Sequence, residues 1–464
     1  MNRRWAALPG LILGKLLESE IGRWYNWGIV RGLRLIMCKP CEKGGVMMEA
    51  GEHGSRIWMF LREANCGSFV VGTNDAITDV QGVKVGHVTL SSTAASPASQ
   101  AGVVRTGVTA VVPRPGNLHR NKVRAAVHVI NGFGKAVGLW QVQELGEIET
   151  PILLTNTLSV ATAADGILDY MLAQDKEIGV SRGTVNPIVL ECNDGYLNDI
   201  RGRHVRREHV LEAIAMASSG MVEAGGVGAG AGMVSFGFKG GIGSSSRLVP
   251  TGVAAGVAGG SGAAGGSGVA EAAGPRYTVG CLVLANYGRP GELVVRGIPV
   301  GRLLRERRQA WLDEHMRVWG CGCDVFDEHR ARSGAGSVIV VLATDAPLGR
   351  AALARMARRA GAGIARTGSY YAAGSGDFVV VFSTSADVGN VDTALMDSMF
   401  SATAEAVEAA VLNALFSART TVGRDGRLVP SLTEFDADLE ASLDKPLREL
   451  FLQEGVRQPS PGVV

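Results

Sequence analysis

The stretch that decides the organisation of this chain is GSVIVVLATDAPL, residues 336–348. Val338 to Leu342 form an uninterrupted β-branched and aliphatic run, which predicts a strand covered on both faces. Ser337 then lies at a fixed edge of the core, directly after Gly336. If the bond between these two residues were broken, Ser337 would carry a hydroxyl and a free α-amine, and an α-amine with a pKa of ~7.7–8.0 can act as the activating base. The competing interpretation is a serine that only begins a strand after a glycine turn.

Composition limits the classes of protein to consider. With 464 residues, 46% of them hydrophobic and 19% charged, the chain can bury a sizeable core. The net charge is +2, from 46 basic and 44 acidic residues, so no excess of positive charge is available for nucleic acid. We therefore expect a small-molecule or peptide partner.

The cysteines do not indicate a disulfide or metal framework. There are seven, an odd number without a repeating spacing. The pairs Cys38/Cys41 and Cys321/Cys323 lie far apart, and no His-x₃₋₅-His pattern follows them. We expect neither a metal nor another cofactor.

The expected location is the cytoplasm. No uninterrupted apolar stretch reaches the ~18 residues of a membrane span. The basic and apolar start, residues 3–13, is interrupted by Lys15 and Glu18 and is followed by no clear small-residue cleavage site.

Changes in composition and in hydrophobic pattern divide the chain into segments. Residues 1–72 mix Trp, Arg and Gly without periodicity and are expected to be a poorly ordered extension. A single domain is expected over 73–427, with a flexible Ala/Gly/Ser insertion at 252–274 and a peripheral tail at 428–464. Strands are expected at 107–113, 125–130, 152–156, 277–286, 338–342 and 378–382, and helices at 162–174, 209–217, 302–317, 350–360 and 391–416. Strands and helices in this mixed order predict a layered α/β fold.

Two familiar kinds of site fit the sequence poorly. The glycine run from Gly225 to Gly243 resembles a dinucleotide-binding loop, but a helix precedes it and Gly240-Gly241 would break a helix that followed. Backbone packed close to the core is the favoured interpretation. Several histidines could supply the base of a triad, yet no Gly-x-Ser-x-Gly elbow follows a strand.

A third group of residues fits Ser337 better. Ser375 and Asp377 come just before an apolar strand, where a hydroxyl and a carboxylate could relay a proton, although Ser-Gly-Asp alone is an ordinary turn. Asn286, near the end of its strand, could donate to a developing oxyanion, although an isolated asparagine there more often belongs to a turn. The segment ECNDGYLND, residues 191–199, could hold a substrate ammonium through a carboxylate, with a solvated turn as the alternative.

Six motifs occur in one order and together carry a resemblance. They are TDVQGVKVGH (78–87), ECNDGYLND (191–199), the glycine run (225–243), TVG (278–280), GSVIVVLATDAPL (336–348) and TVGRDG (421–426). This set resembles the P1 family of serine peptidases, the DmpA and β-peptidyl aminopeptidase group that forms peptidase family S58. The resemblance covers roughly Asn74 to Arg427, apart from insertions.

The resemblance implies a fold and an activity. The fold would be an αββα sandwich, similar to the N-terminal nucleophile hydrolases but with another connectivity. The precursor would cut itself between Gly336 and Ser337, and the processed protomers would assemble as a homo-oligomer, commonly a tetramer. The activity would be hydrolysis of N-terminal residues from short peptides, amides or esters through an acyl-enzyme, with the preference for L-, D- or β-aminoacyl groups left open.

The resemblance also implies a role for each site residue. Ser337 would be the nucleophile, and Glu191 would bind the substrate amino terminus. The other catalytic residues would be Ser375 and Asp377 in proton transfer, Asn286 in the oxyanion hole and Tyr196, with Asn193 as a substrate-binding neighbour of Glu191. Some members of the family carry Glu in place of Asp377 and an aromatic residue in place of Asn193.

Three other functions stay open at this level. An acyltransferase of the ornithine acetyltransferase type has a related fold and also cleaves itself, but its nucleophile is a threonine. A nucleotide-binding module would use the glycine run. A non-catalytic scaffold would keep the fold without the chemistry.

Overall fold

The structure is a computed structural model that describes residues 67–92, 102–251, 275–319, 336–389 and 391–436. The insertion expected at 252–274, most of the extension expected at 1–72 and the pairs Cys38/Cys41 and Cys321/Cys323 lie outside the described residues.

Two β-sheets organise the described part of the chain. The six-stranded sheet has the order β4-β3-β12-β11-β10-β9, with β4 Glu147–Ile148, β3 Val123–Gly132, β12 Gly376–Ser383, β11 Gly336–Thr344, β10 Arg276–Tyr287 and β9 Gly241–Pro250. The four-stranded sheet has the order β1-β2-β5-β6, with β1 Lys84–Ser92, β2 Val104–Val112, β5 Ile152–Asn156 and β6 Ile188–Cys192. Short pairs are formed by β7 Val234–Ser235 with β8 Phe238–Lys239 and by β13 Thr421–Val422 with β14 Leu428–Val429.

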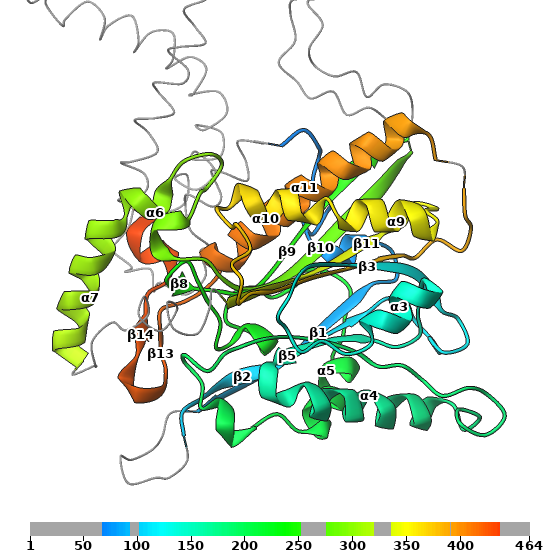
Figure 1. The fold of residues 1–464 in the computed structure, drawn as a ribbon, viewed down its shortest axis with the longest axis horizontal. Coiled ribbons are helices and arrows are strands. Elements are labelled where there is room, and N and C mark those ends of the chain that lie inside the picture. Colours follow the sequence, from blue (N-terminus) through cyan, green and yellow to red (C-terminus); the bar gives the residue numbers. More distant parts are fainter. Residues whose placement is uncertain (1–66, 93–101, 252–274, 320–335, 390, 437–464) are drawn as a thin grey trace, which may run out of the picture. The chain divides into compact units, whose positions relative to one another are not determined.

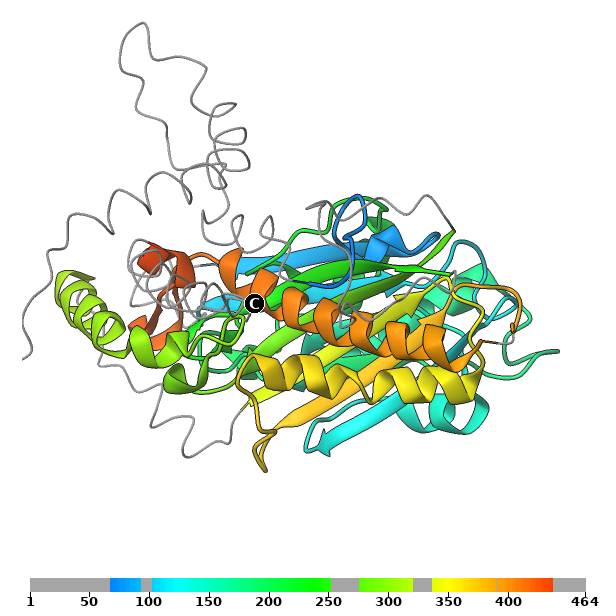
Figure 2. The same cartoon turned by 90° about the horizontal axis from the view of Figure 1, so that it is seen from above.

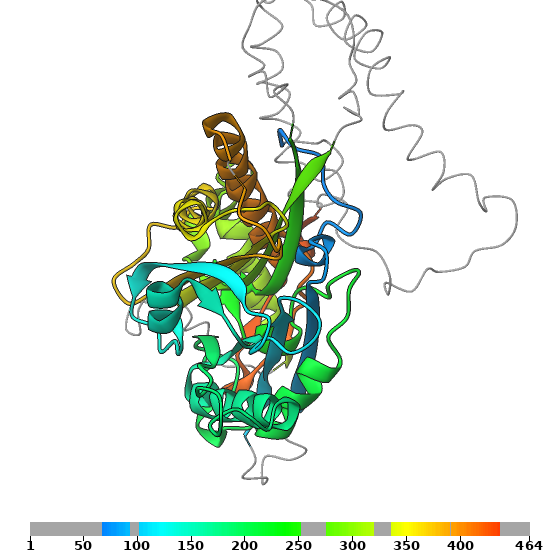
Figure 3. The same ribbon diagram turned by 90° about the vertical axis from the view of Figure 1, so that its right-hand side faces the viewer.

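Helices cover the outer face of each sheet (Figures 1 and 3). Over the six-stranded sheet lie α9 Arg350–Ala357, α10 Ala360–Arg366 and α11 Thr393–Phe416, and in Figure 2 α10 and α11 run side by side. Over the four-stranded sheet lie α4 Val160–Gln174 and α5 Arg207–Ala215. The remaining helices are α3 Leu139–Leu145, α6 Val300–Leu303 and α7 Arg305–Trp319.

Strand β11 shows why the four layers hold together. Val338, Val340 and Leu342 belong to the apolar core between the six-stranded sheet and its helices. Ile339, Val341 and Ala343 belong to a second core between the two sheets. Because successive side chains of a strand point to opposite faces, a strand buried on both faces must be apolar throughout. The expected αββα sandwich is confirmed by these layers.

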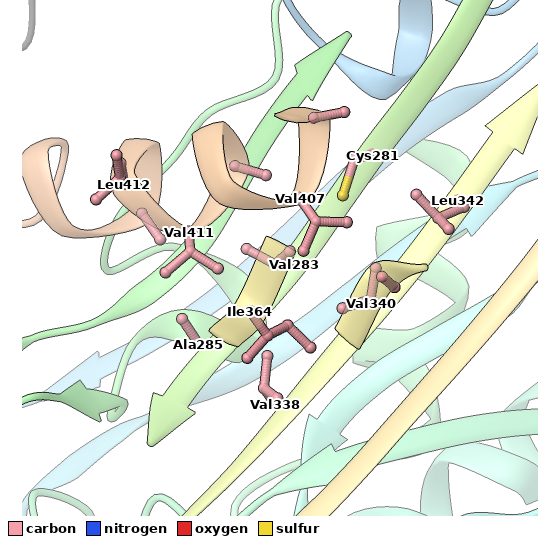
Figure 4. Close-up of a cluster of buried hydrophobic side chains, with 14 of the residues drawn as sticks. Cys281, Val283, Ala285, Val338, Val340, Leu342, Ile364, Val407, Val411 and Leu412 are labelled. Carbon is pink, nitrogen blue, oxygen red and sulfur yellow. The ribbon is translucent and has the colours of Figure 1, made fainter. Parts of the chain in front are cut away.

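Helix α11 packs its apolar side chains on the six-stranded sheet (Figure 4). Val407 and Val411 lie over Val283 and Val340, which are fully buried. By length and composition α11 could cross a membrane, but 89% of its most apolar window is buried in the fold. This burial is typical of a core helix.

The domain extends beyond both expected boundaries, residues 73 and 427. Val70 forms a β-bridge to Leu248, and the backbone N–H of Gly72 donates to the Ser246 hydroxyl at 3.0 Å. At the other end Leu432 and Phe435 are buried in the core against α11 and its sheet, so residues 428–436 are not a peripheral tail. The few apolar residues of 428–436 stand among polar ones without a helical or strand period, so the sequence pattern did not assign this segment to the domain.

Two helices also differ from expectation. The helix expected at 350–360 is two helices, α9 and α10, joined at residues 358–359. The helix expected at 302–317 corresponds to α6 and α7, in which Leu304, Arg308 and Leu312 are buried.

Candidate active site

Ser337 is the second residue of β11 and lies between two partner strands. It pairs with Asn286 of β10 on one side and with Gly376 of β12 on the other. The backbone N–H of Gly376 donates to Ser337 Oγ at 3.1 Å, and Ser337 is only 8% exposed. The hydroxyl is thus held at the edge of the core, as the sequence predicts.

Glycines allow the backbone to approach this hydroxyl. A Cβ on Gly376 would lie 2.8 Å from the backbone of Gly134 and 3.1 Å from Ser337 Oγ. Gly336 has a φ of 85°, in the left-handed region that disfavours any residue with a side chain. The peptide bond before Ser337 therefore has a backbone conformation suited to glycine.

Ser375 and Asp377 form a hydrogen-bonded pair at the start of β12. Ser375 Oγ donates to Asp377 Oδ1 at 2.6 Å, and the backbone N–H of Val338, next to the nucleophile, donates to the same oxygen at 3.2 Å. Asp377 is 1% exposed, and Oδ2 has no hydrogen-bond partner among the described residues. Burial raises the pKa of Asp377 to about 6, against the opposing effect of the two hydrogen bonds.

Asn286 is held in one orientation beside Ser337. Its Oδ1 accepts from the backbone N–H of Val234 at 3.0 Å, and its Nδ2 donates to the carbonyl of Asn193 at 2.9 Å. Because one of these partners can only donate and the other can only accept, the amide cannot be reversed without losing both bonds. A buried amide fixed in this way is suited to binding a developing oxyanion.

Glu191 reaches the same end of the fold from the other sheet. Cys192, the next residue, places its Sγ 3.4 Å from the carbonyl oxygen of Ser337. Glu191 is 2% exposed and accepts hydrogen bonds from the backbone N–H of Lys135, at 2.9 Å, and from the hydroxyl of Thr157. No salt bridge to Glu191 occurs in the described part of the chain, so its carboxylate is positioned by neutral donors and can receive an ammonium.

Asn193 and Tyr196 take different positions from Glu191. The side chain of Asn193 accepts from the backbone N–H of Gly195 at 2.9 Å and closes a turn, while its carbonyl orients Asn286. The ring of Tyr196 is buried in a small cluster with Leu197, Val234 and Val429, and the guanidinium of Arg427 lies 5.0 Å from its centre. These contacts hold the ring of Tyr196 in place, and its expected catalytic role stays a prediction.

The glycine run packs as backbone close to the core. It contains only one 3-10 turn, Gly228–Gly230, and leads into β9, so no α-helix N-terminus is available there for a phosphate. Buried Lys239 donates from Nζ to the carbonyls of Gly230, at 2.9 Å, and Gly240, at 2.8 Å. Burial lowers the pKa of Lys239 to about 7. These contacts stabilise the segment around Val234, whose backbone N–H orients the side chain of Asn286.

A histidine base finds no support in the described residues around Ser337. His87 lies on β1 in the other sheet, where its Nδ1 is 2.9 Å from Thr109 Oγ1. Burial lowers its pKa to about 4, so the imidazole is neutral near pH 7.

Some residues of the site carry no distinctive sequence signal. Thr157 follows β5, and its hydroxyl reaches Glu191 because β5 and β6 are parallel neighbours that end at the same edge. The rule that polar residues gather after the carboxyl ends of parallel strands could have found it. Asn131, the next-to-last residue of β3, lies against the Ser375 loop, and Gly134, which follows β3, lies against Glu191.

Four groups meet at one end of the two stacked sheets. They are the buried hydroxyl of Ser337, the oriented amide of Asn286, the hydrogen-bonded pair Ser375–Asp377, and the carboxylate of Glu191, which has no salt bridge among the described residues. That arrangement defines a serine hydrolase of the N-terminal nucleophile class. Peptidase family S58 matches residues 75–429, and the chain belongs to this family. It is a serine aminopeptidase, a peptide hydrolase.

Named relatives agree with this assignment. The chain is 39% identical over 385 residues to the beta-peptidyl aminopeptidase BapA of Sphingosinicella microcystinivorans, covering 81% of this chain and 89% of the relative. Among solved structures, the PH0078 protein of Pyrococcus horikoshii OT3 is 46% identical with a TM-score of 0.66, covering 79% of this chain and 94% of that one. The L-aminopeptidase D-Ala-esterase/amidase of Ochrobactrum anthropi, described as a variant of the Ntn hydrolase fold, is 31% identical with a TM-score of 0.67, covering 83% and 98%.

Proposed function

We propose that the chain cleaves itself between Gly336 and Ser337, and that the exposed Ser337 then removes N-terminal residues from short peptides, amides or esters. The observation that supports this most directly is the position of Ser337 between Asn286 and Gly376, with the Ser375–Asp377 pair hydrogen-bonded to the residue after it.

The mechanism follows from the contacts of each group. After processing, the α-amine of Ser337 accepts the hydroxyl proton as Oγ attacks the substrate carbonyl carbon. Charge develops on the carbonyl oxygen and is stabilised by the Asn286 amide. The intermediate then collapses, the C–N bond breaks, and the leaving amine takes the proton. A water molecule attacks the resulting ester by the same route, which releases the amino acid and restores Ser337. Ser375 and Asp377 assist the proton transfers.

The substrate would be recognised by its free amino group. Glu191 presents a buried carboxylate with no cationic partner among the described residues, so an ammonium there gains a charge-assisted hydrogen bond. Two relatives are named β-peptidyl aminopeptidases, and we extend that specificity to this chain as part of the proposal. The family resemblance supports a homo-oligomer, a tetramer of processed protomers. The cytoplasm is the location that we expect from the sequence.

Mass spectrometry of the purified protein, combined with an activity assay, tests this function. We expect the wild-type chain to yield a fragment that begins at Ser337 and to hydrolyse a β-aminoacyl p-nitroanilide. Ser337→Ala should remain one full-length chain without activity. Continued cleavage or hydrolysis by Ser337→Ala would show that another residue is the nucleophile. Acetyl transfer to ornithine in place of hydrolysis would favour the acyltransferase alternative.

A further inference from the structure

Asn131 connects β3 to the part of the site that transfers protons. It is the next-to-last residue of β3 and pairs with Asp377 in the antiparallel ladder between β3 and β12. The register shifts between Asp377 and Phe378, since Asp377 pairs with Asn131 and Phe378 pairs with Val129. This irregularity inserts one extra residue in β3 and re-aims the side chains beside it, as β-bulges commonly do next to active sites.

The Asn131 amide group holds the loop that precedes β12. Its Nδ2 donates to the carbonyl oxygens of Ser375 at 2.5 Å, Ala372 at 3.1 Å and Ala373 at 3.2 Å. Two amide hydrogens thus serve three carbonyls of one loop. The backbone N–H of Ser375 closes that loop by donating to the Ala372 carbonyl at 2.8 Å.

These contacts act on Ser375 more than on any other group of the site. The Ser375 hydroxyl must reach Asp377 Oδ1, two residues along the chain, across the point where loop becomes strand. Asn131 fixes both ends of the segment 375–377. Its side chain binds the carbonyl of Ser375, and its backbone lies opposite Asp377 in the ladder. Without the Asn131 amide, the loop 372–375 could keep its turn while the Ser375 hydroxyl moved away from the Asp377 carboxylate.

We propose that Asn131 is a positioning residue that sets the rate of proton transfer by holding Ser375 in line with Asp377, an inference that rests on the proposed function of this pair. It does not touch the substrate in this assignment. Its effect passes through Ser375, so it should vanish when Ser375 has no hydroxyl. A residue that merely stabilises the fold would lower activity equally in both backgrounds.

The test is a double-mutant cycle of Asn131→Ala with Ser375→Ala in the full chain, measured as kcat and KM on an aminoacyl p-nitroanilide. Displacing a catalytic group by about 1 Å can cost about 10²-fold in rate, so we expect Asn131→Ala to lower kcat by about 10- to 100-fold with KM within about twofold. In the Ser375→Ala background the same substitution should change kcat by less than about threefold, because its target hydroxyl is absent.

Two further variants separate this role from folding. Asn131→Asp keeps the shape but replaces the donor with a carboxylate facing three carbonyls, so it should lose at least as much kcat as Asn131→Ala. Asn117→Ala is the matched control, because Asn117 also links two segments, through Asp175 at 3.3 Å and the Arg120 backbone N–H at 3.1 Å, but lies after β2 at the opposite end of its sheet. It should leave kcat unchanged.

The outcomes are distinct. Equal losses from Asn131→Ala in both backgrounds, an unchanged kcat, or a loss confined to KM would overturn the positioning role. If Asn131→Ala does not fold, Asn131→Asp is measured in the same cycle against the same criteria. Hydrolysis that survives in Ser337→Ala would instead overturn the proposed function itself, whatever the cycle shows.

Discussion

Asn286 lies directly opposite Ser337 in the antiparallel pairing of β10 with β11. The two residues are far apart in sequence, and the register of this ladder alone makes them neighbours. A slip of one residue would turn every side chain of β11 to the other face and exchange its two buried sets. The apolar cores on both sides of β11 therefore also determine that the amide meets the nucleophile.

Asn286→Ala should reduce turnover strongly. Removal of one oxyanion donor typically costs ~10²–10³-fold in kcat. The Val234 N–H and the Asn193 carbonyl would also lose their partner, at a cost of about 1–3 kcal/mol each when a buried group is left unsatisfied. Steady-state kinetics and thermal unfolding measure the two effects separately. A variant that kept wild-type kcat would exclude Asn286 from the oxyanion hole.

Asp377→Asn should abolish most activity and raise stability at neutral pH. Burial raises the pKa of Asp377 to about 6 from 3.8, so between these values the folded chain binds more protons than the unfolded chain. The free energy of unfolding of the wild type consequently falls by up to about 3 kcal/mol as pH rises through this window. Asp377→Asn has no ionisable group at this position and should not show this fall.

Denaturant unfolding at pH 4 and pH 7 checks the stability prediction for Asp377→Asn. The two proteins should differ little at pH 4, and the variant should be the more stable at pH 7. A variant that is less stable than the wild type at pH 7 would mean that the buried charge has a compensating partner. In the wild type, kcat should first decrease as pH falls below ~8, because the α-amine of Ser337 becomes protonated, and should decrease further below about 6, as Asp377 becomes protonated.

Glu191→Gln should raise KM for substrates with a free amino group. Charge-assisted hydrogen bonds are roughly twice as strong as neutral ones, so we expect an increase of at least about tenfold. The matched control is Glu149→Gln, because Glu149 is equally buried but is paired with Lys122 at 2.9 Å. It should change stability and leave KM unaltered. Equal KM values for Glu191→Gln and the wild type would place the ammonium elsewhere.

Gly376→Ala should stop both self-cleavage and hydrolysis. The new Cβ would lie 2.8 Å from the Gly134 backbone and 3.1 Å from Ser337 Oγ, so either strand β12 or the hydroxyl must shift. Gly183→Ala is a suitable control because nothing lies within 4 Å of its added Cβ and its φ is not positive. Intact mass reports processing of both variants. A fully processed and active Gly376→Ala would show that this approach of backbone to hydroxyl is dispensable.

Much of this molecule could be predicted from the sequence. The apolar run after Ser337 requires burial on both faces, and the structure places it in the middle of a sheet between two cores. The order of six motifs pointed to the family, and Ser337, Asn286, Ser375, Asp377 and Glu191 all lie at the strand ends where they were expected. Local periodicity and turn chemistry carry that information because they depend on neighbours in the chain.

The contacts of Tyr196 and Asn131 could not be predicted from the sequence. Tyr196 stands beside the substrate-binding segment in sequence, yet its ring packs in an apolar cluster with Val429, which belongs to the far end of the chain. Asn131 carries no motif of its own, yet its amide holds the loop of Ser375.

The sequence by itself determined six of the strands, β2, β3, β5, β10, β11 and β12, the burial of β11 on both faces, and the place of a candidate nucleophile at the start of β11, but it did not indicate β1 or β9. Only the tertiary structure decided which side chains surround that nucleophile. The physical reason is that hydrogen bonds between strands depend on register and sheet order, which are set by packing two sheets and their helices together. A hydroxyl, an amide and two carboxylates from separate strands become one site only after that packing is complete.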